Sequence, residues 1–332
     1  MTHMKAGGLS MRNLFHTTAV LLALGYYTPA FAADDGCPRG TLDKKYCDRD
    51  GDLVADTPTG ADDILDPKTL IFSYTPIEDP AMWQDVWARF LDHLKKTTGK
   101  NVTFFQVQNY SAQLEALRSG RLHIAGINAG STPVAVNCAG FVPTVQLGTE
   151  QGPWGYTMEI IVPAKSAVKS VPDLKGKTIA FVSPTSATGF KAPTILLKNK
   201  FGMELDRDYK SRFTGKHETS IIGVANDDYE AAAVAGDLIK RISDRKVIDI
   251  NSVKIIYESE PFPGTAFGIT NRLAPTLAGK VREAFLTYDW ANDPKLKREL
   301  PDVTRFVPTD YKAAFQMIRD IDTQSGVKYD CK

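Results

Sequence analysis

Residues 173–193, DLKGKTIAFVSPTSATGFKAP, join a short apolar run to a loop rich in hydroxyl side chains. The apolar residues 179–182 are bounded by Gly176 and Pro184, a pattern that predicts a short buried strand. A helix is expected to follow, over residues 193–199. The stretch therefore predicts a strand, a loop and a helix start in direct succession.

The loop between this strand and helix has the composition of an anion-binding loop. Backbone N–H groups in the first turn of a helix lack intrahelical partners and carry the positive end of the helix dipole. An oxyanion finds donors there without a formal cation, and Thr185, Ser186 and Thr188 can add hydroxyl donors. The alternative is that Ser186 and Thr188 only cap the helix.

The first 32 residues have the pattern of a secretory signal peptide. Lys5 and Arg12 precede an apolar core over residues 14–27, and small residues follow up to Ala32. We expect cleavage after Ala32 and export to the periplasm. The core is too short to span a membrane, and no later stretch reaches the roughly 18 apolar residues that spanning requires.

The charge of the chain is balanced. It carries 40 basic and 39 acidic residues, and residues 1–32 contain two of the basic ones and none of the acidic ones. This balance argues against a nucleic acid or a membrane surface as a partner reached by bulk electrostatics. Any anion recognition must be local. The remaining 300 residues exceed a typical single core and predict two domains.

Four cysteines in an exported chain favour disulfides over catalytic thiols. Cys37 and Cys47 are close in sequence and are predicted to pair, which leaves Cys138 with Cys331. The sequence alone leaves the other connectivities open.

An acidic loop follows Cys47, with carboxylates at loop positions 1, 3, 5 and 9. These carboxylates belong to Asp48, Asp50, Asp52 and Asp56. Oxygen ligands on alternate residues, with a glycine at the turn, suit calcium. The loop resembles the short calcium loops of thrombospondin type 3 repeats more than an EF-hand. It predicts a structural calcium site, and the alternative is a solvated acidic turn.

Strands and helices are expected to alternate along the rest of the chain, which predicts an α/β fold with parallel strands. Residues 33–68, rich in Asp, Gly and Pro, are expected to form a poorly cored N-terminal extension. The predicted strands cover residues 69–74, 102–107, 123–128, 157–163 and 178–182. The predicted helices cover residues 81–97, 111–119, 193–199, 229–242, 274–291 and 311–321.

Four stretches resemble substrate-binding proteins of phosphate, phosphite and phosphonate ABC transporters, and the likeness extends over roughly residues 69–321. They are Tyr74-Thr75-Pro76, Asn109-Tyr110, residues 173–177 with 188–190, and residues 217–220 with 224–230. The resemblance implies a two-lobed periplasmic binding protein fold, type II-like, with the ligand in the cleft between the lobes. It implies a first lobe from residues 69–158 and 259–332, and a second lobe from residues 159–258.

The resemblance also implies the oxyanion contacts. Ser186, Ala187 and Thr188 match a Ser-Thr-Ser sequence that holds phosphonate oxygens in the family. Ala187 departs from this pattern, because it keeps the backbone N–H but lacks the hydroxyl, and Thr185 is a candidate substitute. Tyr110 matches a family tyrosine that reaches the ligand.

Five further residues are expected at the cleft. Tyr74 lies in a turn that faces it, while Ser131 and Thr132 replace a Gly-Pro and aromatic pattern usual in phosphonate-binding relatives. His217 matches a phosphonate contact, and Glu218 matches a residue that accepts a hydrogen bond from an aminoalkyl substituent. For Tyr74, Tyr110, His217 and Glu218 the alternative is an ordinary structural role.

The function predicted from the sequence is therefore non-enzymatic. The chain is expected to bind a small phosphorus oxyanion without a cofactor, to act as a monomer, and to deliver its ligand to an ABC transporter permease. An exported phosphoester hydrolase is one alternative, but His93, His123 and His217 stand in neither an HExxH nor a GxSxG context. A calcium-stabilised structural protein is the other, and it does not explain the anion loop.

Overall fold

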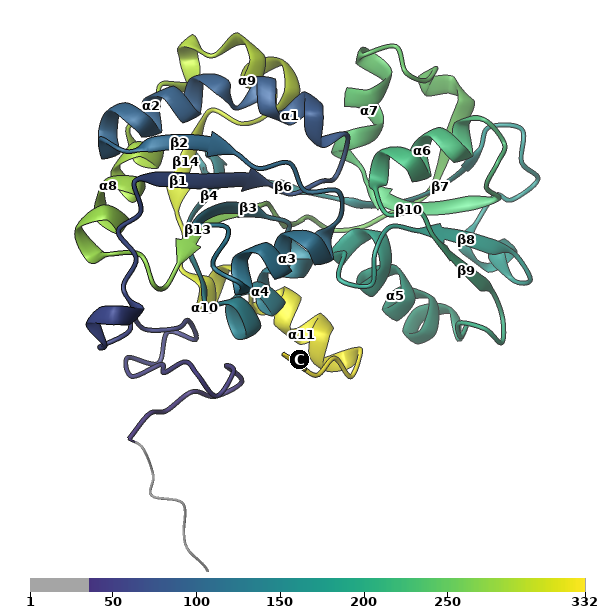
Figure 1. Ribbon diagram of the computed structural model, residues 1–332. Helices are drawn as coiled ribbons and strands as arrows, with labels where there is room; N and C mark the ends of the chain where they lie inside the picture. The colour runs from purple at the N-terminus through teal and green to yellow at the C-terminus, as the bar shows by residue number, and fades with distance from the viewer. Residues whose placement is uncertain (1–35, 332) are drawn as a thin grey trace, which may run out of the picture. The chain divides into compact units, whose positions relative to one another are not determined.

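The computed structural model describes residues 36–331, so the predicted signal peptide, residues 1–32, lies outside the described residues. The described chain is built around two β-sheets (Figure 1). We call the elements around the seven-stranded sheet lobe 1 and those around the five-stranded sheet lobe 2. Among the described helices, none is both long and apolar enough to cross a membrane.

The sheet of lobe 1 has the strand order β14-β4-β13-β3-β1-β2, with β5 paired to β4. Strands β1, β2 and β3 are parallel, whereas β13 runs antiparallel to both β3 and β4. The strands are β1 (Thr69–Tyr74), β2 (Asn101–Phe104), β3 (Ile124–Ile127), β4 (Phe141–Thr149), β5 (Gly152–Pro153), β13 (Ala266–Thr270) and β14 (Arg305–Pro308).

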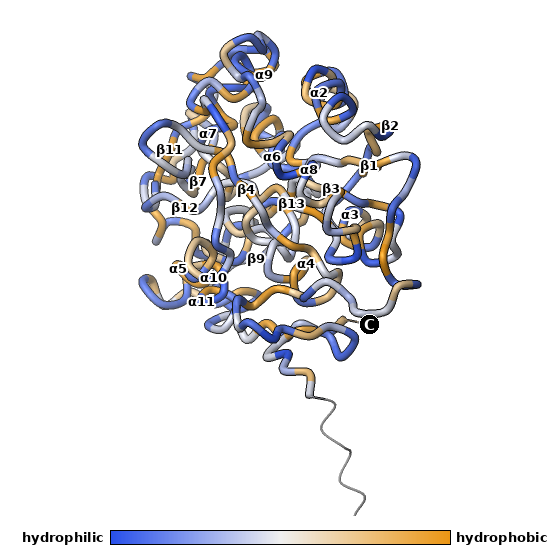
Figure 2. The backbone as a smooth tube through the Cα atoms, turned by 90° about the vertical axis from the view of Figure 1, so that its left-hand side faces the viewer, coloured by the Kyte–Doolittle hydropathy of each residue, from blue (hydrophilic) through white to orange (hydrophobic). Residues whose placement is uncertain are grey.

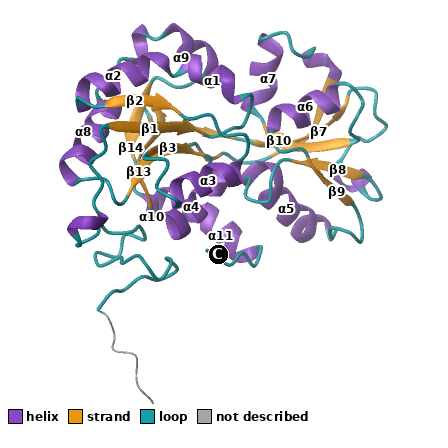
Figure 3. Cartoon of the chain, in the orientation of Figure 1, coloured by secondary structure: helices purple, strands orange, loops and turns teal. Residues whose placement is uncertain are grey.

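Helices cover both faces of this sheet (Figure 3). One face packs an aromatic core, with Trp87, Phe90 and Phe285, under α1 (Pro80–Val86), α2 (Ala88–Thr98), α8 (Pro275–Leu286) and α9 (Pro294–Glu299). The other face packs under α3 (Tyr110–Arg118), α4 (Thr132–Ala139), α10 (Tyr311–Ala314) and α11 (Gln316–Gln324). Hydrophobic stretches follow the strands inside, and hydrophilic ones gather in the outer loops (Figure 2).

The sheet of lobe 2 has the order β11-β7-β10-β8-β9 and is also covered on both faces. Its strands are β7 (Met158–Pro163), β8 (Thr178–Phe181), β9 (Lys210–Phe213), β10 (Ala231–Ala235) and β11 (Val253–Glu258). Its helices are α5 (Ala192–Phe201) on one face, and α6 (His217–Ala225) and α7 (Asp237–Asp244) on the other.

The chain passes between the lobes twice. The two crossing segments, β6 (Gly155–Tyr156) and β12 (Phe262–Pro263), pair antiparallel with each other. The C-terminal helix α11 also contacts lobe 2, because Asp322 Oδ1 lies 2.5 Å from Lys191 Nζ in a fully buried ion pair. Paired crossing strands are the arrangement expected of a hinge between two lobes.

The helix predicted over residues 229–242 is wrong. Residues Ala231–Ala235 form the strand β10, and the helix α7 begins only at Asp237. The sequence Ala-Ala-Ala-Val-Ala has high helix propensity, but every residue of β10 is buried between two layers of helices. Tertiary packing thus overrides the local preference, and small side chains let the helices approach the sheet.

Both predicted disulfides are confirmed: Cys37 pairs with Cys47, and Cys138 pairs with Cys331. The N-terminal extension is packed against lobe 1 rather than separate from it. Asn271 Nδ2 donates to Asp56 O at 2.9 Å, and the Tyr46 side chain is buried in the same core as α3 and α4.

Candidate ligand site between the lobes

A cavity lies between the two lobes. Lobe 1 contributes Tyr74, Ile77, Asn128, Leu147, Trp154, Thr265 and Leu300; lobe 2 contributes Ser186, His217, Ala235, Asp237, Leu238 and Arg241; and Tyr156 comes from the crossing strand β6. Three of the predicted site residues, Tyr74, Ser186 and His217, therefore line one cavity. Of the three, Ser186 and His217 come from lobe 2, and Tyr74 faces them from lobe 1.

The hydroxyl-rich loop enters this cavity through Ser186. The loop leaves β8 and turns through a π-helical segment, Ala187–Lys191, before α5 begins. Ser186 Oγ accepts a hydrogen bond from Gly189 N at 3.1 Å, so the predicted capping role is present. Ser186 also lines the cavity, so the capping role does not exclude a ligand contact.

His217 is held in one tautomer by its backbone contact. The Ala235 N–H donates to Nδ1 at 3.1 Å, so a neutral imidazole carries its proton on Nε2. Burial, together with the positive charge of Arg241, lowers the pKa of His217 to about 3. Nε2 lies 3.4 Å from Ser186 Oγ. At neutral pH the ring is therefore an uncharged donor beside the cavity.

Two buried hydroxyls near Ser186 lack a well-formed hydrogen bond. They belong to Thr188, through Oγ1, and to Tyr110. Tyr156 lies beside Thr188, and Ser186 lies beside the Tyr110 hydroxyl. Burial raises the pKa of Tyr110, so this hydroxyl stays protonated and able to donate. Neither residue lines the cavity itself, but both are close to the side chain that does.

Ser131 and Thr185 face each other across the cleft. Their hydroxyl oxygens are 2.9 Å apart, and Asn128 Nδ2 donates to Ser131 Oγ at 3.0 Å. The two hydroxyls that were predicted to contact the ligand therefore form a hydrogen bond with each other, between lobe 1 and lobe 2. Thr132 does not line the cavity. Its hydroxyl donates to Asn128 O at 3.0 Å, at the start of α4.

The two lobes approach backbone to backbone at Gly130. A Cβ atom at this position would lie 2.2 Å from Ala187 N and 2.3 Å from Thr185 O. Ala187 itself is buried in the apolar core next to α4 and does not line the cavity. Only a residue without a side chain permits this approach.

Glu218 is placed outside the cavity. Its Oε2 accepts from the Asp79 N–H at 3.1 Å, and its Oε1 lies 3.6 Å from Arg245 Nη2. It follows His217 on the first turn of α6, so it points away from the cavity toward a group of charged residues. The sequence match placed Glu218 correctly beside His217, but the predicted contact with the ligand cavity is absent and Glu218 pairs with Arg245 instead.

Sequence reasoning missed Asp237 and Arg241, which form an ion pair in the cavity wall. Asp237 Oδ2 lies 2.9 Å from Arg241 Nη2, one helical turn apart on α7. Burial raises the pKa of Asp237, and Arg241 opposes that shift. A polar residue directly after a buried strand, at a helix start, is a signal that could have identified Asp237. Asn128, Trp154, Tyr156 and Thr265 were missed as well.

The acidic loop lies on lobe 1, in the N-terminal extension. One carboxylate oxygen each from Asp48, Asp50 and Asp52 lies within 4.8 Å of the others. Asp56 is not part of this group, since it pairs with Arg49 at 2.9 Å. Asp48 is buried, and its Oδ1 has no hydrogen-bond partner. Burial and the neighbouring carboxylates raise the pKa of Asp52.

Comparison with known families gives a match over most of the chain. Residues 72–314 match the model of the periplasmic substrate-binding protein of phosphonate ABC transporters. A phosphate-import protein, PhnD, of Mycolicibacterium smegmatis is 24% identical over 229 residues, which is 66% of this chain and 71% of the relative. A phosphonates-binding periplasmic protein of Escherichia coli is 25% identical over 274 residues, 78% of this chain and 80% of the relative.

Solved structures show the same fold. A binding protein component of a phosphonate ABC transporter from Pseudomonas aeruginosa superposes with a TM-score of 0.70 at 21% identity, covering 79% of this chain and 87% of the other. PhnD1 from Prochlorococcus marinus, in complex with methylphosphonate, superposes with a TM-score of 0.68 at 17% identity, covering 79% of this chain and 100% of the other. The architecture is that of two-lobed periplasmic binding proteins, as predicted.

Proposed function

This chain belongs to the family of periplasmic substrate-binding proteins of phosphonate ABC transporters, and on that premise we propose that it binds a small phosphorus oxyanion between its lobes. The ligand is a phosphonate, phosphite or phosphate, which the protein delivers to an ABC transporter permease. One observation carries the proposal: neutral donors of lobe 2, Ser186 and His217, share a cavity with Tyr74 and Asn128 of lobe 1.

The donors suit an oxyanion. Ser186 and His217 both line the cavity, with Oγ and Nε2 3.4 Å apart, and the buried hydroxyls of Thr188 and Tyr110 are nearby. Hydrogen bonds to a charged group contribute about 1.5 to 3 kcal/mol each, so a few of them support micromolar or tighter binding.

A hydrolase is not favoured by the same geometry, although Ser186 and His217 are neighbours. A general base needs a free lone pair on the nitrogen that faces the nucleophile. Here the Ala235 N–H occupies the lone pair of His217 Nδ1, so Nε2 carries the proton and faces Ser186. The pair can donate hydrogen bonds, but His217 cannot accept the Ser186 proton in this tautomer.

Titration calorimetry and solution scattering test the proposal. We expect phosphate, phosphite, methylphosphonate or 2-aminoethylphosphonate to bind with a Kd of about 10 μM or below. Saturating ligand is expected to keep the lobes together and to lower the radius of gyration relative to ligand-free protein, because a ligand held by both lobes favours the closed state. If none of the four anions binds, the proposed function is wrong.

We also propose that the acidic loop holds a structural calcium ion. The three carboxylates of Asp48, Asp50 and Asp52 are close enough to share one cation, and the buried Asp48 Oδ1 lacks any other partner. A cation would offset the mutual repulsion that contributes to the raised pKa of Asp52. Its role would be to order the extension, since the loop lies on lobe 1 and lines no part of the ligand cavity.

Calcium removal is expected to destabilise the extension without changing ligand affinity. At a hundredfold excess of calcium over its Kd, the stabilisation is about 2.7 kcal/mol, so hydrogen exchange over residues 37–68 should be slower with calcium than with chelator. Asp50→Asn should abolish this difference. Asp62→Asn, an exposed change in the same extension, should retain it. Identical exchange of metal-stripped and calcium-loaded protein would contradict the site.

A further inference from the structure

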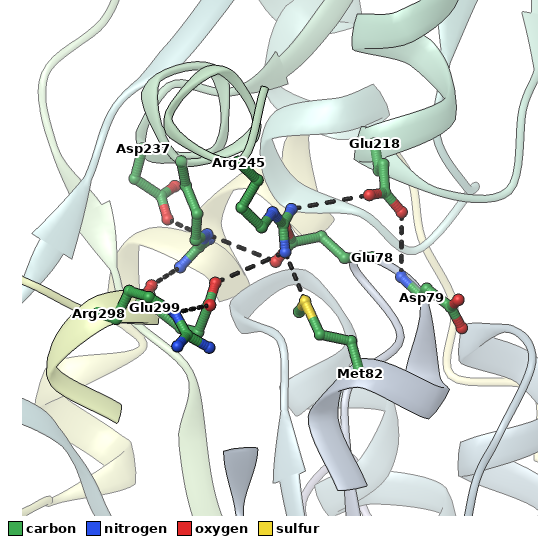
Figure 4. A network of polar contacts seen from close by, with 9 residues as sticks. Glu78, Asp79, Met82, Glu218, Asp237, Arg245, Arg298 and Glu299 are labelled. Atoms are coloured by element: carbon green, nitrogen blue, oxygen red, sulfur yellow. Dashed lines mark hydrogen bonds and ion pairs between the residues drawn. The ribbon is translucent and has the colours of Figure 1, made fainter. Parts of the chain in front are cut away.

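A network of charged side chains joins the two lobes beside the ligand cavity (Figure 4). We call it the interlobe ion network. Its members are Glu78 and Glu299 of lobe 1, and Glu218, Asp237, Arg241 and Arg245 of lobe 2.

The ion pairs between the lobes in this network run from lobe 1 carboxylates to Arg241 of α7 and to Arg245, the residue that caps the C-terminus of α7. Arg241 Nε lies 3.4 Å from Glu78 Oε2, and its Nη1 donates to the main-chain oxygen of Glu299 at 2.6 Å. Arg245 pairs with Glu78 and lies 3.5 Å from Glu299 Oε2. Arg241 and Arg245 are one helical turn apart, so they lie on the same face of α7.

The lobe 1 carboxylates are deeply buried. The side chain of Glu78 is 0% exposed and that of Glu299 is 2% exposed. A buried carboxylate without a cation is strongly unfavourable, whereas water solvates it when the lobes separate. Removal of one arginine charge therefore penalises the closed arrangement and leaves the open arrangement nearly unaffected.

Arg245 is the informative member because it does not line the cavity, whereas Arg241 does. Arg245 also reaches Glu218, which follows His217 on α6, so one guanidinium contacts Glu78, Glu218 and Glu299. It therefore connects α6 and the C-terminal end of α7 to lobe 1.

We infer that Arg245 is a positioning residue for ligand binding: through Glu78 and Glu299 it sets how often the lobes are closed, and thereby the affinity for every ligand alike. The inference rests on the proposed function. Apparent affinity falls in proportion to the fraction of protein that is in the binding-competent state. Because Arg245 does not line the ligand cavity, its loss is expected to change that fraction and to leave the preference among ligands unchanged.

The test compares Arg245→Gln with Lys240→Gln. Lys240 lies on α7, where its side chain is 73% exposed and pairs with Asp244 of the same lobe. Calorimetry with phosphate, phosphite, methylphosphonate and 2-aminoethylphosphonate measures affinity. For Arg245→Gln we expect a loss of about ten- to hundredfold, equal for each anion that binds the unaltered protein. Lys240→Gln should bind like the unaltered protein.

Two results would overturn the inference: unchanged affinity in Arg245→Gln, or a loss confined to some of the anions. If Arg245→Gln does not fold, Arg245→Lys carries the test, since it keeps a positive charge but lacks the planar guanidinium that contacts Glu78, Glu218 and Glu299 together. It should fold and still bind every anion more weakly by one common factor, because fewer contacts hold the lobes closed. Affinity equal to that of the unaltered protein would then count against the network.

Failure of the proposed function gives a different result. If no phosphorus oxyanion binds the unaltered protein, the ligand assignment is wrong, and the network is tested by scattering of ligand-free protein. Arg245→Gln should then have a larger radius of gyration than Lys240→Gln. Equal radii in the two variants would overturn the inference independently of the ligand.

Discussion

Gly130→Ala is expected to weaken ligand binding more than about a hundredfold while both lobes remain folded. The added Cβ would lie 2.2 Å from Ala187 N and 2.3 Å from Thr185 O, distances that no real Cβ contact tolerates. Both neighbours are backbone atoms of the other lobe, so the conflict can be relieved only by separating the lobes. Calorimetry should show the loss of affinity, and scattering should show a larger radius at saturating anion.

Gly279→Ala is the matched control for this change. A Cβ at Gly279 meets no atom within 4 Å, and the residue lies inside α8. Alanine in a helix interior raises the free energy of unfolding by about 0.5 to 1 kcal/mol relative to glycine. This variant should therefore have a slightly higher melting temperature and an unchanged ligand affinity. If Gly130→Ala binds as tightly as Gly279→Ala, the lobes do not meet at this point in the ligand-bound state.

The fold was predictable where the local pattern and the tertiary environment agree. Residues 69–74 were predicted as a strand and form β1, where an apolar run over residues 70–72 stands between polar residues. The predicted helix over residues 229–242 failed because β10 consists of residues that favour helices and become a strand only through burial on both faces. Strands such as β4 and β13 pair with partners far along the chain and carried no comparable local signal.

The candidate site divides in the same way. Ser186 and His217 follow recognisable local motifs, and both line the cavity. Asp237 and Arg241 were missed because their surroundings come from contacts with Glu78, about 160 positions away along the chain. These polar residues form a site or a network only when the two lobes are in contact. No single stretch of sequence predicts which residues of the two lobes will then be neighbours.

Motif matching also assigned to a site two residues that pair with an arginine instead, Glu218 and Asp56. Glu218 follows His217 directly, but successive residues on a helix point in directions about 100° apart, so one faces the cavity and the other faces Arg245. Asp56 fits the spacing of a calcium loop, yet Arg49 is nearby and takes its carboxylate. Spacing constrains which residues can meet, and neighbouring charges decide which of them do.

Ser186→Ala and Thr188→Ala are expected to separate capping from ligand binding. Ser186 accepts from Gly189 N and lines the cavity, so its loss should cost about 1 kcal/mol of stability and also lower affinity about ten- to hundredfold. Thr188 Oγ1 is buried and makes no well-formed hydrogen bond, so Thr188→Ala should change the melting temperature little. Its affinity should fall by a similar factor if the hydroxyl reaches the anion.

The control for both variants is Thr194→Ala, in which a hydroxyl that donates to Lys191 O at 2.8 Å within the first turn of α5 is removed. It should lose some stability and no affinity, since Thr194 does not line the cavity. Thermal melts and calorimetry with phosphate, phosphite, methylphosphonate and 2-aminoethylphosphonate provide both quantities for each variant. Unchanged affinity in Ser186→Ala, in Thr188→Ala and in the double variant would remove these hydroxyls from the site. Binding would then have to rest on His217 and on the backbone N–H groups of the loop, whose donors no side-chain substitution in residues 185–188 takes away.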